Sequence, residues 1–112
     1  MKKLEIVIRP EKLDALKQVF TEHKVSGMMI TNIMGYGNQK GYRQQYRGSE
    51  YNVNLLPKVK IETVVSDKKV EKLIDSICAS IKTGEFGDGK IFLIPVDDAV
   101  RIRTGERGEN AL

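Results

Sequence analysis

The stretch KVKIETVVSDKKVEKLIDSICASI, residues 58–81, changes from one hydrophobic period to another within a single run. Apolar and charged residues alternate from residue 59, and β-branched residues continue to residue 65, which is the pattern of a strand. After Ser66, which suits the N-cap of a helix, apolar residues recur every three or four positions along one face. The stretch therefore predicts a strand that leads directly into a helix. The helical set is Val70, Leu73, Ile74, Ile77 and Ile81.

The first third of the chain shows the same order of patterns. Residues 4–8 alternate as a strand does, and Pro10 then suits the first turn of a helix, where its missing N–H has no helical partner. Gly27 follows the expected helix end, and residues 28–34 form an apolar run that is typical of a strand. The apolar face of the helix consists of Leu13, Leu16, Val19 and Phe20.

The last third adds a glycine-rich loop at 83–89 and a fourth strand at 91–96. Beyond it, Val100, Ile102 and Thr104 alternate with polar residues, which predicts a short further strand before a polar tail. The order is that of the split βαβ, ferredoxin-like plan of α+β proteins, in a single domain over residues 1–112. Two helices leave one face of four strands uncovered, so we expect an oligomer.

Composition limits the function more than the fold. Charged residues make up 30% of the 112, the AVILMFWYC class 40% and aromatic residues 6%, which is the composition of a soluble globular protein. No stretch approaches the roughly 18 uninterrupted apolar residues of a membrane span. Glu5 and Arg9 interrupt the apolar core that a secretion signal would need. We therefore expect a cytoplasmic protein.

The chain has one cysteine, Cys78, and one histidine, His23. A single cysteine excludes an internal disulfide and a thiolate metal site, and no nucleophile–base pair can be assigned. We expect Cys78 to be a small buried filler beside the apolar stripe, and His23 to lie in the last turn of the first helix. These residues favour a binding or regulatory protein over an enzyme, and the net charge of +4 favours an anionic partner.

Residues 35–54 differ in character from the rest of the chain. They contain four glycines and four tyrosines, and aliphatic residues are almost absent before Val53. Loops longer than about 12–15 residues in compact domains are usually functional or disordered. We therefore expect a long functional loop with frayed strand ends.

Two glycine-rich segments approach known nucleotide-binding motifs without matching them. GYGNQKG at 35–41 is one residue too long for the dinucleotide fingerprint, and no helix is expected after it. GEFGDGK at 84–90 is followed by Ile91 where a P-loop needs Ser or Thr, and it lies between a helix and a strand in the reverse order. Its backbone N–H groups can still form an anion-binding nest with Lys90 at the edge, although a plain turn explains the segment equally well.

Basic residues leave two further questions open. Arg101 and Arg103 would share one face of an extended segment, either gripping a polyphosphate or lying solvated on an edge strand. Basic residues interleaved with Tyr42 and Tyr46 can bind nucleic acid through its phosphates. The alternative function is thus a small basic nucleic-acid-binding module of the same fold.

Five motifs occur in a fixed order over nearly the whole chain: GYGNQKG at 35–41, YRGSEY at 46–51, LPKVKIE at 56–62, TG at 83–84 with GDGKIF at 87–92, and RIRTGE at 101–106. Together they resemble the PII nitrogen-regulatory signal transducers. The resemblance implies a homotrimer of ferredoxin-like subunits with nucleotide sites between neighbours. It also implies ATP or ADP as competing effectors, and 2-oxoglutarate bound together with Mg²⁺ and ATP.

The resemblance also assigns residues to these ligands. Arg101 and Arg103 would reach the phosphates from the adjoining subunit, and Gly27 and Met28 would lie near the adenine. The other residues implied for the nucleotide are Gly35, Tyr36, Gly37, Asn38, Gln39, Val64, Gly87, Asp88, Gly89 and Lys90. Those implied for 2-oxoglutarate are Gly37, Gln39, Lys40, Gly41, Lys58 and Gly87, with Lys58 on a carboxylate and the Gln39 amide oxygen on Mg²⁺.

The family pattern divides the chain into a T-loop at 37–54, a B-loop at 82–90 and a C-terminal segment at 101–112. The T-loop would dock onto partners, with contacts from Tyr42, Arg47 and Tyr51, and bound ligands would bias its conformation. Tyr51 is also the position that is uridylylated in some relatives. The implied partners are an ammonium transporter, which would bring a cytoplasmic protein to the membrane, and enzymes or regulators of nitrogen metabolism. Direct nucleic-acid binding is not expected.

Overall fold

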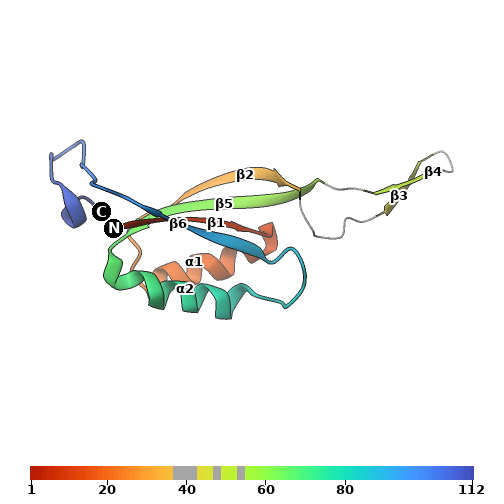
Figure 1. The fold of residues 1–112 in the computed structure, drawn as a ribbon, viewed down its shortest axis with the longest axis horizontal. Helices are drawn as coiled ribbons and strands as arrows, with labels where there is room; N and C mark the ends of the chain where they lie inside the picture. Colours follow the sequence, from red (N-terminus) through yellow and green to blue (C-terminus); the bar gives the residue numbers. More distant parts are fainter. Residues whose placement is uncertain (37–42, 47–48, 53–54) are drawn as a thin grey trace.

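Two helices cover one face of a four-stranded antiparallel sheet in the computed structural model of this chain, which describes residues 1–36, 43–46, 49–52 and 55–112 (Figure 1). The sheet order β2-β5-β1-β6 confirms the predicted ferredoxin-like α+β plan. The elements are β1 Lys2–Ile8, the 3₁₀ turn η1 Pro10–Lys12, α1 Leu13–Glu22, β2 Met29–Gly35, β3 Arg43–Tyr46, β4 Ser49–Asn52, β5 Leu56–Val65, α2 Asp67–Ile81, β6 Gly89–Pro95 and the 3₁₀ turn η2 Gly108–Ala111.

The core lies between the sheet and the helices, as the two hydrophobic periods require. Alternate residues of β1 and β5 point toward the helices and are buried, while α1 and α2 each contribute one apolar stripe. Burial of these side chains is the main source of fold stability. The core consists of Leu4, Ile6, Ile8, Leu16, Val19, Phe20, Val59, Ile61, Val65, Val70, Leu73, Ile77 and Ile81.

The opposite face of the sheet, here called the open face, carries charge at its centre. The Lys3 ammonium lies 2.6 Å from a carboxylate oxygen of Glu62 and 3.3 Å from one of Glu5, and Lys60 lies 3.5 Å from Glu62. Phe92 pairs with Glu5 across the ladder and is half exposed. Both helices lie on the other side, so no described element of the chain covers this face (Figure 1).

The predicted strand at 100–104 is wrong, because the chain reverses there. Residues 102–104 form a turn, and the only ladder contact is a single bridge between Val100 and Arg107 within the described C-terminal segment. The N–H of Gly105 donates to the carbonyl of Arg101 at 2.7 Å, and Gly105 has φ +74°, which glycine adopts without strain. Arg101 and Arg103 therefore do not share one face of an extended segment.

Of two predictions about single residues, the one for Cys78 is wrong and the one for Ser66 is confirmed. Cys78 is exposed, because it lies about 100° around α2 from Ile77, outside the buried stripe. Ser66 is the N-cap residue, but its side chain makes no capping bond; its carbonyl accepts the N–H of Lys69 instead.

The segment predicted as a long loop contains paired strands. Residues of β3 and β4 are antiparallel partners, from Arg43 opposite Asn52 to Tyr46 opposite Ser49. They lie well beyond the end of the sheet at which β2 ends and β5 begins (Figure 1). A two-stranded ribbon without a third strand or a helix against it has little stability of its own.

Gly89 is expected to tolerate no side chain. It has φ +116°, and a Cβ built there would lie 1.9 Å from the carbonyl oxygen of Val7 on β1. Gly89→Ala should therefore lower the free energy of unfolding by about 3 kcal/mol or more in urea titrations. Gly84→Ala is the matched control: its φ is +89°, but nothing lies within 4 Å, so a loss of about 1 kcal/mol is expected. Equal losses would contradict the steric explanation.

A candidate anion-binding site at one end of the sheet

Arg9, Lys58 and the glycine-rich loop meet at one end of the sheet, because β1 lies between β5 and β6. Ile8, the last residue of β1, pairs with Val59 and with Gly89. Arg9 is therefore adjacent to Lys58 on one side and to the glycine-rich loop on the other. This register brings together residues that are about 30 and 80 positions apart in the sequence.

The B-loop is closed from within by one carboxylate. Asp88 accepts the hydroxyl of Thr83 at 2.6 Å and the N–H groups of Thr83 and Gly84 at 2.7 and 2.9 Å. The Thr83 hydroxyl is the main reason that the pKa of Asp88 lies below its ordinary value, and the two N–H groups add to the effect. The Asp88 carboxylate is therefore hydrogen-bonded within the loop itself.

Arg9 and Lys58 hold the same loop from outside. The Arg9 Nε donates to the carbonyl oxygen of Gly87 at 3.0 Å, and its Nη2 donates to that of Phe86. The Lys58 Nζ donates to the Gly87 oxygen at 2.9 Å. The sequence analysis assigned Lys58 but missed Arg9. The available signal was a basic residue placed directly before Pro10, between a strand and a helix.

Lys58 is almost buried, with 9% of its surface exposed. Burial lowers the pKa of its ammonium below the ordinary value, and the positive charge of Arg9 lowers it further. Gly35 leaves space for its stem, since a Cβ there would lie 2.9 Å from the Lys58 Cγ. A nearly buried ammonium beside a partly exposed guanidinium makes this end of the sheet attractive to an anion.

The loop also offers unused donors. The N–H groups of Gly87 and Asp88 donate no hydrogen bond to another described residue. Lys90 is exposed and forms no ion pair with any residue that the structure describes. Free backbone donors beside glycines and a lysine are the donor set that phosphate oxygens need, so these residues fit the predicted phosphate group.

A second group of predicted residues lies at the other end of β2 and β5. Thr63 donates its hydroxyl to the carbonyl of Gly27, which holds the start of β2 against β5. Val64 lines a hollow of about 250 Å³ there, together with residues of the α1–β2 connection, the start of α2, Glu109 and Leu112. Gly27 and Val64 are thus separated from Gly35 and Lys58 by the length of β2, about 20 Å.

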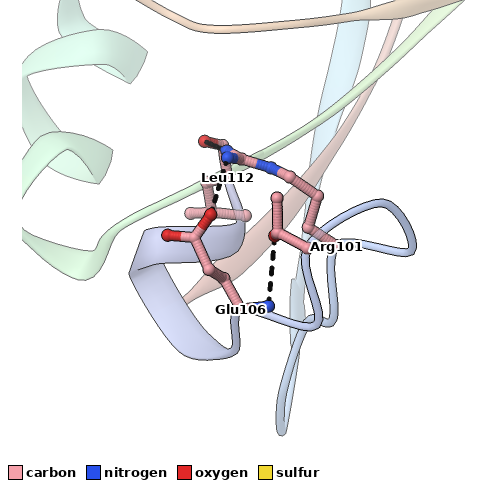
Figure 2. A network of polar contacts seen from close by, with 4 residues as sticks. Arg101, Glu106 and Leu112 are labelled. Carbon is pink, nitrogen blue, oxygen red and sulfur yellow. Dashed lines mark hydrogen bonds and ion pairs between the residues drawn. The ribbon is translucent and has the colours of Figure 1, made fainter.

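Arg101 and Arg103 do not reach the B-loop of their own subunit. They follow β6, whose seven residues separate them from Gly89 by about 20 Å. Arg101 is engaged locally: its Nη1 lies 3.1 Å from a carboxylate oxygen of Glu106, and its Nη2 donates to the backbone oxygen of Leu112 at 3.1 Å (Figure 2). Arg103 is exposed and has no ion pair with a described residue.

Several predicted site residues lie outside the described residues. These are Gly37, Asn38, Gln39, Lys40, Gly41, Tyr42 and Arg47. Tyr51 belongs to β4, but only its backbone is described. Met28 is partly buried and Tyr36 is exposed.

Neither a membrane span nor a metal cluster is found in the described part of the chain. No helix there is long and apolar enough to cross a bilayer. Among the described residues no three His, Cys, Asp or Glu side chains are grouped so as to hold a metal ion.

The split βαβ fold defines a small α+β domain in which Arg9, Lys58 and the glycine-rich loop meet at one end of the sheet. The chain belongs to the nitrogen regulatory protein P-II family, whose family model matches residues 1–106. It is similar to the nitrogen regulatory proteins P-II of Azospirillum brasilense, at 50% identity, and of Microchaete diplosiphon and Haemophilus influenzae, at 49% each. Each of these matches covers 112 residues, which is the whole of both chains.

The lowered pKa of Lys58 predicts a pH dependence of stability. The unfolded chain has the ordinary pKa near 10.5 and binds more protons than the folded chain between the two pKa values, so the unfolding free energy rises with pH in that window. Urea titrations over a pH range that rises toward 10.5 should show wild type gaining stability relative to Lys58→Gln. In this variant Arg9 still donates to the Gly87 oxygen. A constant difference across that range would contradict the assignment.

Proposed function

We propose that this chain is a P-II-type regulator of nitrogen metabolism that senses ATP or ADP and 2-oxoglutarate and controls partner proteins through residues 37–54. The observation that carries the proposal is the B-loop, in which the N–H groups of Gly87 and Asp88 donate to no residue that the structure describes, while the carbonyls of Phe86 and Gly87 accept from Arg9 and Lys58. Family membership supports the regulatory role, and the absence of an assignable nucleophile–base pair in the sequence agrees with it.

The layout of the predicted residues supports a nucleotide site shared between subunits. Phosphates would bind the B-loop N–H groups and Lys90 of one subunit, while Met28 and Val64, about 20 Å away at the same end of the sheet as Arg101 and Arg103, would approach the base from a neighbour. The remaining nucleotide positions, Tyr36 to Gln39, continue directly from β2 into the T-loop. A ligand in this position would therefore touch both the rigid sheet and the loop that contacts partners. Mg²⁺ held by Gln39 would neutralise phosphate charge.

Lys58 is the residue that we assign to a carboxylate of 2-oxoglutarate, with Gly37, Lys40 and Gly41 as the nearby loop positions. Its ammonium is nearly buried and already bonded to a single carbonyl oxygen. A charged ligand oxygen makes a stronger hydrogen bond to an ammonium than a neutral carbonyl does. The dicarboxylate would thus replace an existing weaker contact.

The position of the two arginines supports a homotrimer with sites shared between subunits. Arg101 and Arg103 lie about 20 Å from Gly89 of the same chain, so they can contribute to a phosphate site only in a neighbour. The open face, with Phe92 and the charges around Glu62, is available for packing against copies of the chain.

The partners that we propose are an ammonium transporter and enzymes or regulators of nitrogen metabolism. Placement of β3 and β4 beyond the sheet would let residues 43–46 and 49–52 reach a partner surface (Figure 1). Tyr42, Arg47 and Tyr51 are the proposed contacts, and Tyr51 is the proposed modification position. The protein would act in the cytoplasm and join the membrane through the transporter.

Calorimetry tests the effector assignment directly. We expect ATP and ADP to bind competitively, and 2-oxoglutarate to bind only with Mg²⁺ and ATP. Lys90→Gln should weaken ADP about five- to tenfold by removing a phosphate contact, whereas Lys17→Gln, an exposed helix lysine, should leave it unchanged. Absence of any nucleotide binding at millimolar concentration, together with steeply salt-dependent binding to nucleic acid, would instead favour the nucleic-acid-binding alternative.

Mixed assemblies test the shared sites. Arg103→Gln and Lys90→Gln subunits should each bind ADP weakly alone, because each lacks one half of the site. When the two are co-expressed and mix at random, about a quarter of the sites receive Lys90 from one subunit and Arg103 from its neighbour. These sites should recover wild-type affinity in titrations. If verified mixed trimers showed no recovery, then either Lys90 and Arg103 act in the same subunit's site, or Arg103 does not belong to the site.

A further inference from the structure

Arg9 is a partly buried arginine whose guanidinium binds backbone carbonyls of the B-loop. It follows the last residue of β1 and precedes the η1 turn, so both neighbouring elements restrict its backbone. One edge of its guanidinium, formed by Nε and Nη2, donates to two successive backbone carbonyls, those of Gly87 and Phe86. A planar fork that meets two carbonyls at once fixes the orientation of both peptide units.

The orientation of those carbonyls determines the direction of the donors. In a planar trans peptide the C=O and the N–H of the same unit point in opposite directions. The carbonyl of Phe86 shares its unit with the N–H of Gly87, and the carbonyl of Gly87 shares its unit with the N–H of Asp88. Because Arg9 holds both carbonyls toward itself, both N–H groups are directed away from it. Neither of these two N–H groups has a described hydrogen-bond partner.

Glycine makes this restraint necessary. Gly84, Gly87 and Gly89 all have positive φ, and glycine peptide units rotate more freely than others. Asp88 ties the start of the loop to its end through Thr83 and Gly84, but it does not contact the 86–87 carbonyls. Among the described contacts, those carbonyls are held only by Arg9 and Lys58.

The Gly87 carbonyl has two donors, so it can lose one of them and stay bonded to the other. Its oxygen accepts from both Arg9 and Lys58. If Lys58 turns toward a bound carboxylate, the oxygen keeps Arg9 as its donor and the peptide unit keeps its direction. The phosphate-facing donors are then preserved when the second ligand binds.

We propose that Arg9 is a positioning residue of the phosphate-binding loop: its guanidinium aims the N–H groups of Gly87 and Asp88 at a bound phosphate, and it holds this geometry when Lys58 engages a dicarboxylate. The inference deepens the proposed function and rests on it. Arg9 acts through the loop backbone and does not itself contact the nucleotide.

The test compares Arg9→Gln, Arg9→Lys and Lys17→Gln with wild type. Lys17→Gln removes one exposed positive charge from α1 and is the control for net charge. Without ligand, NMR should show shifted amide resonances and a lower backbone order parameter at Gly87 in Arg9→Gln, because Arg9 alone holds the Phe86 carbonyl among the described contacts. The change at Asp88 should be smaller, since Lys58 still holds the Gly87 carbonyl, and the melting temperature and the rest of the sheet should be unchanged. Arg9→Lys keeps the charge and its donors but lacks the rigid planar fork, so it should lie between.

Calorimetry with ADP and with ATP completes the test. Arg9→Gln should weaken ADP at least fivefold at both low and high salt, and Arg9→Lys should restore part of this loss. If Arg9→Gln binds ADP as Lys17→Gln does, the proposal is overturned. It is also overturned if Arg9→Lys restores full affinity while the amides of Arg9→Gln are unchanged, since charge alone would then explain the loss.

The two levels of the hypothesis can be told apart. If wild type binds no nucleotide, the proposed function fails, whatever Arg9 does. The amide measurement on unliganded protein still reports whether Arg9 orients the loop. If wild type binds ADP normally and the amides of Arg9→Gln do not move, only the role of Arg9 fails.

Discussion

The central position of β1 is the constraint on which the other features depend. Each of its edges pairs over its whole length, with β5 on one side and β6 on the other, and its alternate side chains enter the core. Because Ile8 is matched to Val59 and to Gly89, the next residue must lie between Lys58 and the glycine-rich loop. The close approach of Gly89 to the Val7 carbonyl tightens this junction. A shift of register by one residue would expose the core face and separate the cationic cluster.

The charged Lys58 side chain at this site lowers the stability of the folded chain. Lys58 is nearly buried beside Arg9, and both burial and that neighbouring charge oppose its protonated form. An apolar residue would suit the position better if stability alone mattered. Unfavourable placement of a charge is common at sites that bind charged ligands, and in the proposed function the ligand would supply the missing countercharge. The negative charge of Asp88, in contrast, is stabilised by hydrogen bonds from Thr83 and Gly84.

Most of the architecture could be predicted because it follows from periodicity. The alternation in residues 4–8 and 59–65 identifies β1 and β5, and the helical stripes that follow identify both helices. The apolar runs at 28–34 and 91–96 identify β2 and β6. Prediction failed where apolar and polar residues alternate with period two but the backbone does not form a strand. Val100, Ile102 and Thr104 alternate like a strand, but Gly105 allows the backbone to reverse, and local hydrogen bonds from Gly105 and Arg101 close a turn. Cys78 was misplaced because adjacency in sequence to Ile77 is not adjacency on a helix face.

The sequence alone determined the fold class, the family and most of the candidate ligand residues, because periodic burial and ordered motifs are written locally along the chain. The tertiary structure decided which of those residues meet. It brought Arg9, Lys58 and Gly87 to one point through strand register, and it set Arg101 and Arg103 at the opposite end of β6. The physical reason is that pairing between distant strands depends on which faces bury together, and no local pattern specifies that partnership.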